Sequence, residues 1–154
     1  MNADFLNGKT ALITGAAKRL GAALALALAA KGVRVVLHYN RAEAEAGALA
    51  QTIADAGGVA CLVRADLSSE EAASGVVGQA VQEAGGLDIL INNASAFEEM
   101  DFAGTTGTAI QENMAIHAVA PLVLSRHFAA QGRPGVIINM LDTMVMDYDR
   151  KHLP

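Results

Sequence analysis

The segment TALITGAAKRLG, residues 10–21, decides the fold that we predict for this chain. Its first four residues are apolar or β-branched, as in a strand, and an Ala- and Leu-rich stretch of helical character follows the segment. Between them, Gly15 allows the backbone to turn and lie close to a pyrophosphate, and Gly21 allows a helix to pack tightly against a sheet. The first turn of that helix would offer free N–H groups to a phosphate. An ordinary strand-to-helix turn is the alternative, because the full GxGxxG pattern is absent.

Short apolar runs alternate with longer amphipathic stretches along the rest of the chain. Runs that are apolar throughout predict strands buried on both faces, and helices between them predict parallel strands joined by right-handed crossovers. The expected strands are residues 10–13, 33–37, 59–63, 87–91 and 135–140, and the expected helices are residues 19–31, 42–56, 68–84 and 109–131. The pattern predicts one α/β domain over residues 1–154, with a Rossmann-type doubly wound parallel sheet in three layers. A glycine loop directly after the first strand of such a sheet favours nucleotide binding.

The composition argues against several classes of protein. The chain has 16 acidic and 11 basic residues and a net charge of -5, whereas a nucleic-acid surface needs a basic field. Its single cysteine, Cys61, cannot form an internal disulfide, which favours a reducing compartment. The longest apolar helical stretch, residues 22–30, is far shorter than the roughly 20 residues that cross a bilayer. Because the N-terminus also lacks the pattern of a signal peptide, we expect a soluble, cytoplasmic protein with no membrane partner.

The end of the second expected strand, VVLHYNR, carries the signal for cofactor choice. Folds that prefer NAD place an acid here to hold the ribose hydroxyls, and this chain has none. His38, Asn40 and Arg41 stand there instead, with Lys18 and Arg19 in the glycine loop nearby. Cations and hydrogen-bond donors suit a 2′-phosphate, so we expect NADPH in preference to NADH. The alternative is that Arg41 is only a solvated residue in the first turn of the next helix.

Polar side chains also follow the third and fourth expected strands. Asp66, after the third strand, can accept a hydrogen bond from an adenine amino group, or it can cap the next helix. Asn92 and Asn93, after the fourth strand, can hold the loop in place by bonding to backbone groups. Because the carboxyl ends of parallel strands share one edge of the sheet, the cofactor should pass over this edge.

The segments TGAAKRLG, HYNR, ADLS, NNAS and NMLD, taken in order, resemble the short-chain dehydrogenase/reductase family, and the variants are those of its pteridine reductase branch. Arg19 stands where the family usually has a glycine, and Asp142 replaces the usual serine at the end of the fifth strand. Phe97 lies where that branch has an aromatic residue that sandwiches a pterin against nicotinamide. Ser95 matches a residue that hydrogen-bonds the substrate and a cofactor phosphate.

The resemblance implies an NADPH-dependent reductase, an oxidoreductase that transfers hydride to a C=N bond of a dihydropterin or an oxidised pterin. The catalytic residues of this chain would be Asp142, which holds or relays a proton, and His117. The substrate would contact Arg19, Ser95, Phe97 and Asp142. The residues expected to contact the cofactor are Gly15, Lys18, Arg19, Leu20, Gly21, His38, Tyr39, Asn40, Arg41, Asp66, Leu67, Asn93, Ala94 and Ser95. Family members commonly assemble through the long helix, so the resemblance also implies a homotetramer.

Two departures from the family pattern stand out. The family has an asparagine four residues before a proline of the long helix, where it bends the helix and holds a water that relays protons to a lysine. This chain has His117 four residues before Pro121. A ring nitrogen could do similar work, or His117 could be a partly buried helix residue with a satisfied hydrogen bond. The family's Tyr-x-x-x-Lys motif is absent, and family spacing places it just beyond Pro154, so we expect an N-terminal portion of a reductase, with a sheet incomplete at the C-terminal side and negligible turnover by itself.

Two other functions stay open. A non-catalytic NADP-binding module would bind NADPH without turnover. A reductase of ketones or acyl-carrier thioesters would have a serine in place of Asp142 and no aromatic sandwich, so the sequence disfavours it. Metal enzymes and serine hydrolases are disfavoured too, because the four histidines lack ligand spacing and no GxSxG motif is present. We therefore expect no metal.

Overall fold

The computed structural model describes residues 5–96, 101 and 103–141, which form an open α/β fold. Five parallel strands form one sheet in the order β3-β2-β1-β4-β5. The strands are β1 (Thr10–Ile13), β2 (Arg34–Tyr39), β3 (Ala60–Arg64), β4 (Ile89–Asn92) and β5 (Val136–Asn139). The helices are α1 (Arg19–Ala29), α2 (Glu43–Asp55), α3 (Glu70–Ala84), α4 (Gly107–Met114) and α5 (Ala120–Ala129), with a π-helical turn, η2 (Ala115–Val119), between the last two. None of these helices of the described residues is long and apolar enough to cross a membrane.

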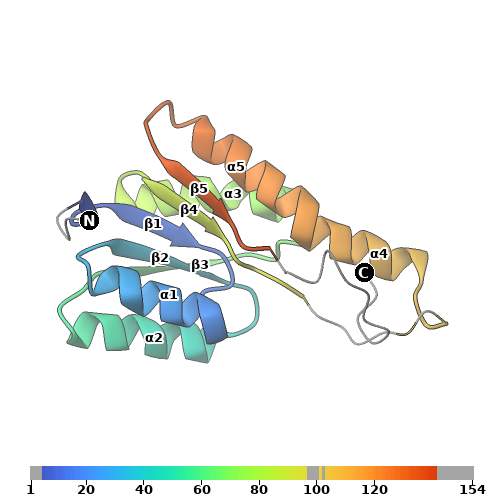
Figure 1. The fold of residues 1–154 in the computed structure, drawn as a ribbon, viewed down its shortest axis with the longest axis horizontal. Coiled ribbons are helices and arrows are strands. Elements are labelled where there is room, and N and C mark those ends of the chain that lie inside the picture. Colours follow the sequence, from blue (N-terminus) through green and yellow to red (C-terminus); the bar gives the residue numbers. More distant parts are fainter. Residues whose placement is uncertain (1–4, 97–100, 102, 142–154) are drawn as a thin grey trace.

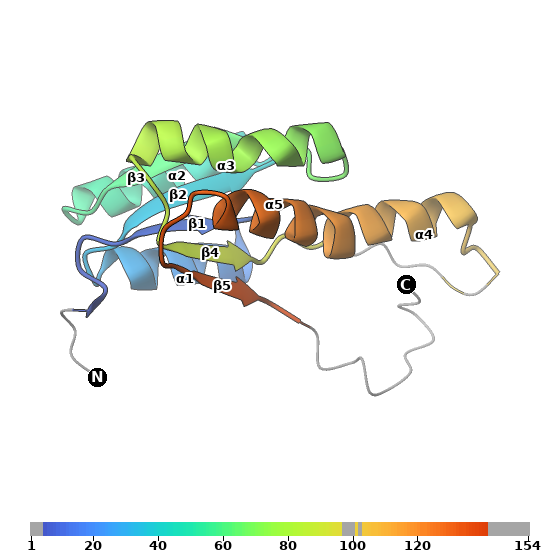
Figure 2. The same ribbon diagram turned by 90° about the horizontal axis from the view of Figure 1, so that it is seen from above.

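Helices cover both faces of the sheet and give the fold three layers (Figure 1 and Figure 2). Ile13 of β1 belongs to the apolar cluster on the face covered by α1 and α2, together with Ile53. Leu12, its neighbour, belongs to the cluster on the face covered by α3 and α5, together with Leu124. Consecutive residues of a strand point to opposite faces, and burying a side chain of this size stabilises a fold by roughly 1.5–3 kcal/mol. The predicted class, a Rossmann-type doubly wound parallel sheet, is confirmed.

The single long helix expected over residues 109–131 is interrupted, so that prediction was wrong in this respect. The chain runs from α4 through η2 into α5, and the N–H of Ala120 donates to the carbonyl of Ala115, five residues earlier. Pro121 lies in the first turn of α5. Proline has no N–H to donate, and its ring clashes with the carbonyl four residues back, so the regular α-helical bond cannot form there. The π-helical turn absorbs this break, and His117 lies at its centre.

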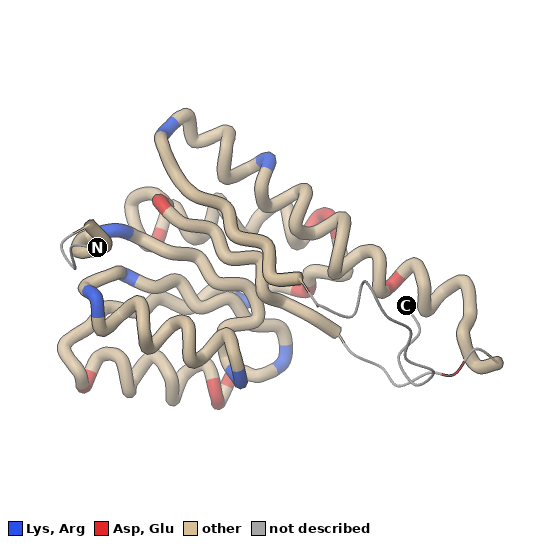
Figure 3. The backbone as a smooth tube through the Cα atoms, in the orientation of Figure 1, with Lys and Arg blue, Asp and Glu red and all other residues tan. Residues whose placement is uncertain are grey.

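β5 forms one edge of the sheet and is poorly covered (Figure 1). Among the described residues it pairs with β4 alone. All of its residues are exposed, including the apolar Ile137 and Ile138, whose exposed fractions are 38% and 41%. Figure 3 shows no position coloured as Lys, Arg, Asp or Glu along this strand. An uncharged apolar strand at a sheet edge is the kind of surface at which another strand can pair.

Candidate functional site

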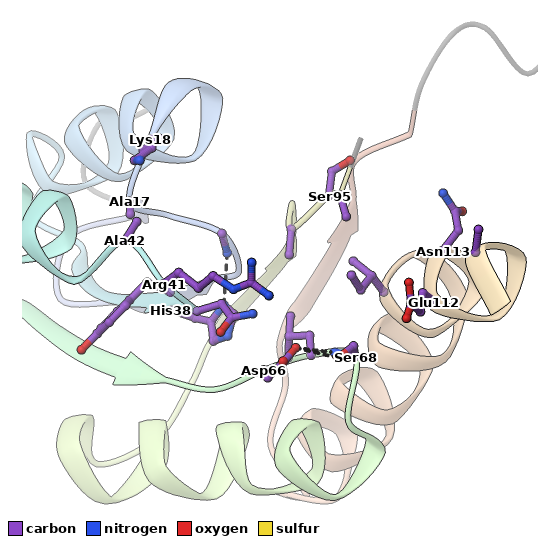
Figure 4. Close-up of a pocket in the computed structure, with 18 residues that line it drawn as sticks. Ala17, Lys18, His38, Arg41, Ala42, Asp66, Ser68, Ser95, Glu112 and Asn113 are labelled. Atoms are coloured by element: carbon purple, nitrogen blue, oxygen red, sulfur yellow. Dashed lines mark hydrogen bonds between the residues drawn. The ribbon is translucent and has the colours of Figure 1, made fainter. Parts of the chain in front are cut away.

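A cavity of about 530 Å³ opens at the carboxyl ends of β1, β2, β3 and β4 (Figure 4). The sheet order reverses between β1 and β4, and open α/β sheets bind ligands at such a reversal. The lining residues come from the end of β2, from the loops after these strands, and from α4 and η2. They are Gly15, Ala17, Lys18, His38, Tyr39, Asn40, Arg41, Ala42, Asp66, Leu67, Ser68, Ala94, Ser95, Ala96, Ala109, Glu112, Asn113 and Ile116. The cavity therefore lies at the sheet edge where the sequence predicted the site.

Most of the residues expected to contact the cofactor line this cavity. The exceptions are Arg19 and Leu20, which are exposed in the first turn of α1, and Gly21 and Asn93, which pack beneath the glycine loop. Phe97 and Asp142 lie outside the described residues. Within residues 5–96, 101 and 103–141, no three His, Cys, Asp or Glu side chains gather closely enough to hold a metal ion.

The glycine loop leaves no space for side chains at two positions. Gly15 has a φ of +62°, and an added Cβ would lie 2.9 Å from the Cα of Ala94. At Gly21, an added Cβ would collide with the carbonyl oxygen of Gly15 and lie 2.8 Å from Nδ2 of Asn93. The close backbone approach expected from these two glycines is therefore present, and it brings the loops after β1 and β4 into contact.

Thr14 joins these two loops through hydrogen bonds. Its Oγ1 accepts from the backbone N–H groups of Asn93 and Ala94, both at 2.9 Å, and donates to the carbonyl of Ile91 at 3.3 Å. In return, Nδ2 of Asn93 donates to the carbonyls of Thr14 at 2.8 Å and Gly15 at 3.2 Å. Asn93 thus holds the loop after β4 in place by bonding to backbone groups, as the sequence indicated. The backbone groups are those of the glycine loop.

Asn92 has a different role. Its side chain is 5% exposed, and Nδ2 donates to Oδ1 of Asn139 at 2.8 Å. This bond joins the ends of β4 and β5 by side chains, whereas the sequence predicted a bond to backbone groups. The expectation for Asn92 is therefore corrected: it ties the two strands together.

Arg19 has a left-handed backbone, with a φ of +51°. It is the only residue other than glycine with a positive φ among the described residues. L-residues pay roughly 1–2 kcal/mol for this conformation because Cβ approaches the following carbonyl. A glycine would avoid this strain, because it has no Cβ. The folded loop holds Arg19 in the left-handed conformation despite its cost.

Replacing Arg19 with glycine should give a more stable protein than replacing it with alanine, by about 1 kcal/mol, because alanine keeps the left-handed strain. Urea unfolding of the two variants measures the difference. The exposed Ala23 of α1 is a matched control, since Ala23→Gly at an ordinary helical position should cost about 1 kcal/mol. If Arg19→Ala proves as stable as Arg19→Gly, the backbone at this position is not strained.

His38 does not stand at the strand tip as expected. Its side chain is 2% exposed. Its Nδ1 accepts from the N–H of Gly15 at 3.1 Å, so the other ring nitrogen, Nε2, donates to the carbonyl of Ala65 at 3.2 Å. Burial lowers the pKa of His38 to about 4, against smaller opposing effects of the Ala65 carbonyl and Asp66. A neutral ring with both nitrogens engaged has no proton to offer a phosphate, so His38 positions the glycine loop.

Arg41 is the cation that points into the cavity (Figure 4). Lys18 also lines the cavity, but its Nζ lies 2.6 Å from Oε1 of Glu45 in the first turn of α2. The hydrogen bond from Lys18 lowers the pKa of the Glu45 carboxyl, which favours the carboxylate. Water screens exposed ion pairs of this kind, so they contribute little to stability, and Lys18 can therefore exchange Glu45 for another anion at little cost.

Asp66 shapes the loop after β3. Its Oδ1 accepts from the backbone N–H of Ser68 at 3.0 Å and from the Ser68 hydroxyl at 2.8 Å. These hydrogen bonds lower the pKa of Asp66. The cap of α3 is Ser69, whose Oγ accepts from the N–H of Ala72 at 3.2 Å. The sequence left two roles open for Asp66. Ser69, not Asp66, caps α3, and contact of Asp66 with an adenine amino group remains a prediction.

Ser95 and His117 meet at the side of the cavity nearest α4. Oγ of Ser95 lies 3.0 Å from Nε2 of His117, and Nδ1 of the same ring lies 3.0 Å from the carbonyl oxygen of Asn113. His117 is exposed, not partly buried, although its ring hydrogen bonds are satisfied. Two residues that the sequence placed separately in the site are thus bonded to each other across 22 positions of the chain.

The helical wall of the cavity was not predicted from the sequence. Ala109, Glu112, Asn113 and Ile116 line it from α4 and η2. Their spacing of three and four residues puts them on one face of a helix, so a signal was present in the sequence. Which face turns toward the cavity depends on how the helix packs, and that information lies in tertiary contacts.

These features define an α/β protein of the Rossmann type, with its cavity at the reversal of the sheet order. The sequence pattern of the family described as short chain dehydrogenase matches residues 9–144, and the chain belongs to this family. The chain is 34% identical to 3beta-hydroxysteroid dehydrogenase 1 of Eggerthella lenta and 33% identical to pteridine reductase 1 of Leishmania tarentolae. It also resembles the crystal structure of FolM alternative dihydrofolate reductase 1 from Brucella canis complexed with NADP, at 31% identity and a TM-score of 0.87.

The chain spans only part of the length of these relatives. The matches cover 89% and 87% of this chain, but 54% of the steroid dehydrogenase and 61% of the pteridine reductase. The match to FolM covers 97% of this chain and 60% of the FolM chain. The activity, substrates and partners of a whole protein therefore apply to this chain only as proposals.

Proposed function

We propose that this chain is the cofactor-binding portion of an NADPH-dependent reductase that transfers hydride to pterin or dihydropterin substrates. The observation that carries the proposal is Arg41, which points into the cavity from the end of β2, while residues 38–42 include no carboxylate. A guanidinium here favours a 2′-phosphate, and the missing carboxylate disfavours NADH. The pterin substrate is supported by the similarity to a pteridine reductase and to FolM.

The residues around the cavity fit a dinucleotide. The start of α1 has no side-chain cap, so its N–H groups are available to phosphate oxygens. The bare backbone at Gly15 allows close approach. Arg41 would bind the 2′-phosphate in a bidentate manner, with Asn40 and Lys18 beside it, and Asp66 would accept from the adenine amino group. The cavity volume of about 530 Å³ lies within the range of small-molecule sites, about 300–1,000 Å³.

The cofactor would supply the hydride, and the chain's own residues would bind and orient the substrate. Phe97 would stack on the pterin ring, and Arg19 and Ser95 would hydrogen-bond it. Asp142 would hold a proton near the ring nitrogen that receives it, and His117 would take part in proton relay. Phe97 and Asp142 lie outside the described residues, so their roles rest on the sequence pattern.

Turnover by this chain alone should be negligible. The sequence contains no Tyr-x-x-x-Lys, because Tyr39 and Tyr148 are followed four positions later by Glu43 and His152. A non-catalytic NADP-binding module would also bind NADPH without turnover, and it is the main alternative. The similarity to a steroid dehydrogenase supports a reductase of carbonyl substrates as a second alternative.

The cellular location, the partners and the oligomeric state are part of the same proposal. We expect a cytoplasmic protein with a small-molecule substrate and no nucleic-acid or membrane partner. Exposed apolar side chains on α4 and α5, among them Met114 and Leu122 at 53% and 70% exposure, support self-association through these helices. A homotetramer of the kind common in the family would bury them.

The Arg41→Ala variant tests the cofactor proposal. The dissociation constant for NADPH should rise about 10- to 100-fold, since hydrogen bonds to charged groups contribute about 1.5–3 kcal/mol. The constant for NADH should change by no more than about twofold, because NADH has no 2′-phosphate to lose a contact. Fluorescence titration of each cofactor measures both constants. Arg126→Ala, an exposed arginine on α5, is the matched control for loss of one positive charge. Equal weakening of the two cofactors would contradict a 2′-phosphate role.

A further inference from the structure

The ion pair between Lys18 and Glu45 joins the glycine loop to the first turn of α2. Nζ of Lys18 lies 2.6 Å from Oε1 of Glu45, and the two side chains are 57% and 48% exposed. Lys18 lines the cavity, whereas Glu45 stands behind it on the helix. Of the ion pairs in the part of the chain that the structure describes, this one alone includes a residue of the cavity wall.

Lys18 and Arg41 are the two cations that line the cavity. They come from the loops after β1 and β2, and they lie on the side of the cavity away from Glu112 and Asn113 of α4 (Figure 4). Arg41 has no ion-pair partner among the described residues. Lys18 is therefore the one of these two cations whose charge is matched by a carboxylate of the chain itself.

The first turn of α2 places negative charge beside these cations. It contains Glu43 and Glu45, and no side chain caps the start of the helix. Acidic side chains stabilise the first turn of a helix through its dipole, and this accounts for the presence of both. Within the described ranges, Glu43 makes no ion pair. The contact with Lys18 therefore distinguishes Glu45 from its neighbour in the same turn.

We propose that Glu45 competes with the 2′-phosphate of NADPH for Lys18 and thereby lowers the preference of this chain for NADPH over NADH. The inference rests on the proposed function, which makes the 2′-phosphate the ligand at Lys18 and Arg41. A phosphate group carries about 1.5 to 2 negative charges at neutral pH. Glu45 opposes it twice, because it occupies Lys18 and because its own charge repels the phosphate. NADH has a neutral hydroxyl at this place and meets neither effect.

The opposite role for Glu45 is to hold Lys18 in position for the phosphate. That role predicts weaker NADPH binding when the carboxylate is removed, whereas competition predicts tighter binding. The exposure of the pair argues for competition, because a lysine ammonium on a flexible stem is poorly fixed by one exposed contact. The sign of the change in affinity therefore decides between the two roles.

Glu45→Gln tests the competition, because it keeps the size of the side chain and removes its charge. NADPH should bind about 2- to 5-fold more tightly, the range expected for an exposed ion pair. The dissociation constant for NADH should stay within about twofold. Fluorescence titration of the full chain with each cofactor measures both constants. Raising the salt concentration should reduce the gain, because salt screens exposed charges. Weaker NADPH binding in this variant would overturn the proposal.

Glu43→Gln is the matched control, since it removes an acid from the same turn of α2. It should tighten NADPH binding less than Glu45→Gln, because Glu43 holds no cation among the residues that the structure describes. An equal gain from the two variants would show a general effect of charge and would overturn competition for Lys18.

Lys18→Gln completes a double-mutant cycle with Glu45→Gln. Without the lysine there is no cation to compete for, so Glu45→Gln should tighten NADPH binding less in this background than in the unaltered chain. The same gain in both backgrounds would overturn the proposal.

The failure of this inference and that of the proposed function look different. A clear preference for NADPH that Glu45→Gln leaves unchanged would overturn the inference alone. Equal binding of NADPH and NADH, both by the unaltered chain and by Glu45→Gln, would overturn the cofactor assignment of the proposed function and the inference with it.

Discussion

Replacing Thr14 with valine should lower the free energy of unfolding by about 2–6 kcal/mol, because two partly buried backbone N–H groups lose their acceptor and each costs about 1–3 kcal/mol when unpaired. The groups are those of Asn93 and Ala94, both 2.9 Å from Oγ1 of Thr14. Thr14 is 1% exposed, so water cannot replace the lost oxygen. Valine has nearly the same shape, so the loss reports on hydrogen bonding more than on packing. Urea unfolding measures it.

Thr14→Ser is the matched control for this prediction. Serine keeps the oxygen and loses one methyl group, so it should cost roughly 1 kcal/mol. A second comparison is Thr52→Val, at an exposed position of α2, which should stay within about 0.5 kcal/mol. If Thr14→Val costs no more than Thr14→Ser, the hydroxyl does not hold the loops after β1 and β4 together. The affinity for NADPH should fall in parallel with stability only if these loops also bind the cofactor.

Acidification should destabilise the protein through His38, and a variant without this histidine should resist part of the loss. Burial lowers the pKa of His38 from 6.5 to about 4 in the folded state. Between these two values the unfolded chain binds a proton that the folded chain does not, so stability falls as pH falls. The contribution is fully present above pH 6.5 and is lost as the pH approaches 4, to a total of about 3 kcal/mol.

Urea unfolding of the unaltered chain and of His38→Gln at several pH values between 7 and 4 measures this contribution. Glutamine does not titrate, so the difference in stability between the two proteins should shift in favour of the variant as the pH falls. Carboxylates shift the stability of both proteins equally and drop out of the comparison. His127→Gln, on a partly exposed residue of α5, controls for the loss of a histidine elsewhere. Parallel pH curves for the unaltered chain and His38→Gln would show that His38 titrates normally.

Local signals predicted the sheet and the glycine loop well. β1 has the predicted bounds, Thr10–Ile13. The glycine turn that follows the apolar run marks clearly where the strand ends. Gly15 and Gly21 were predicted for their lack of a side chain, and the structure leaves no space for one at either position. These features depend on backbone geometry and on neighbours within a few residues, which a sequence displays directly.

Side-chain roles that depend on distant groups could not be predicted in the same way. His38 sits beside the N–H of Gly15 and the carbonyl of Ala65, and these three groups meet only once β1, β2 and β3 are aligned. The contact between Ser95 and His117 likewise joins the loop after β4 to η2, and we expected a regular α-helix where η2 lies. Polar contacts between separate helices and strands therefore make up the part of the site that could not be predicted from the sequence.

The uncovered edge at β5 links the folding of this chain to its assembly. The N–H groups of Val136 and Met140 donate to the carbonyls of Asp88, just before β4, and Asn92, at its end, so the alternating amides of Ile137 and Asn139 face outward. Such a row of donors and acceptors is satisfied equally well by a strand of the same polypeptide and by a strand of a neighbouring molecule. A strand of the same polypeptide and a strand of a neighbouring molecule therefore compete to pair with β5. The strand with the higher effective concentration at this edge is favoured.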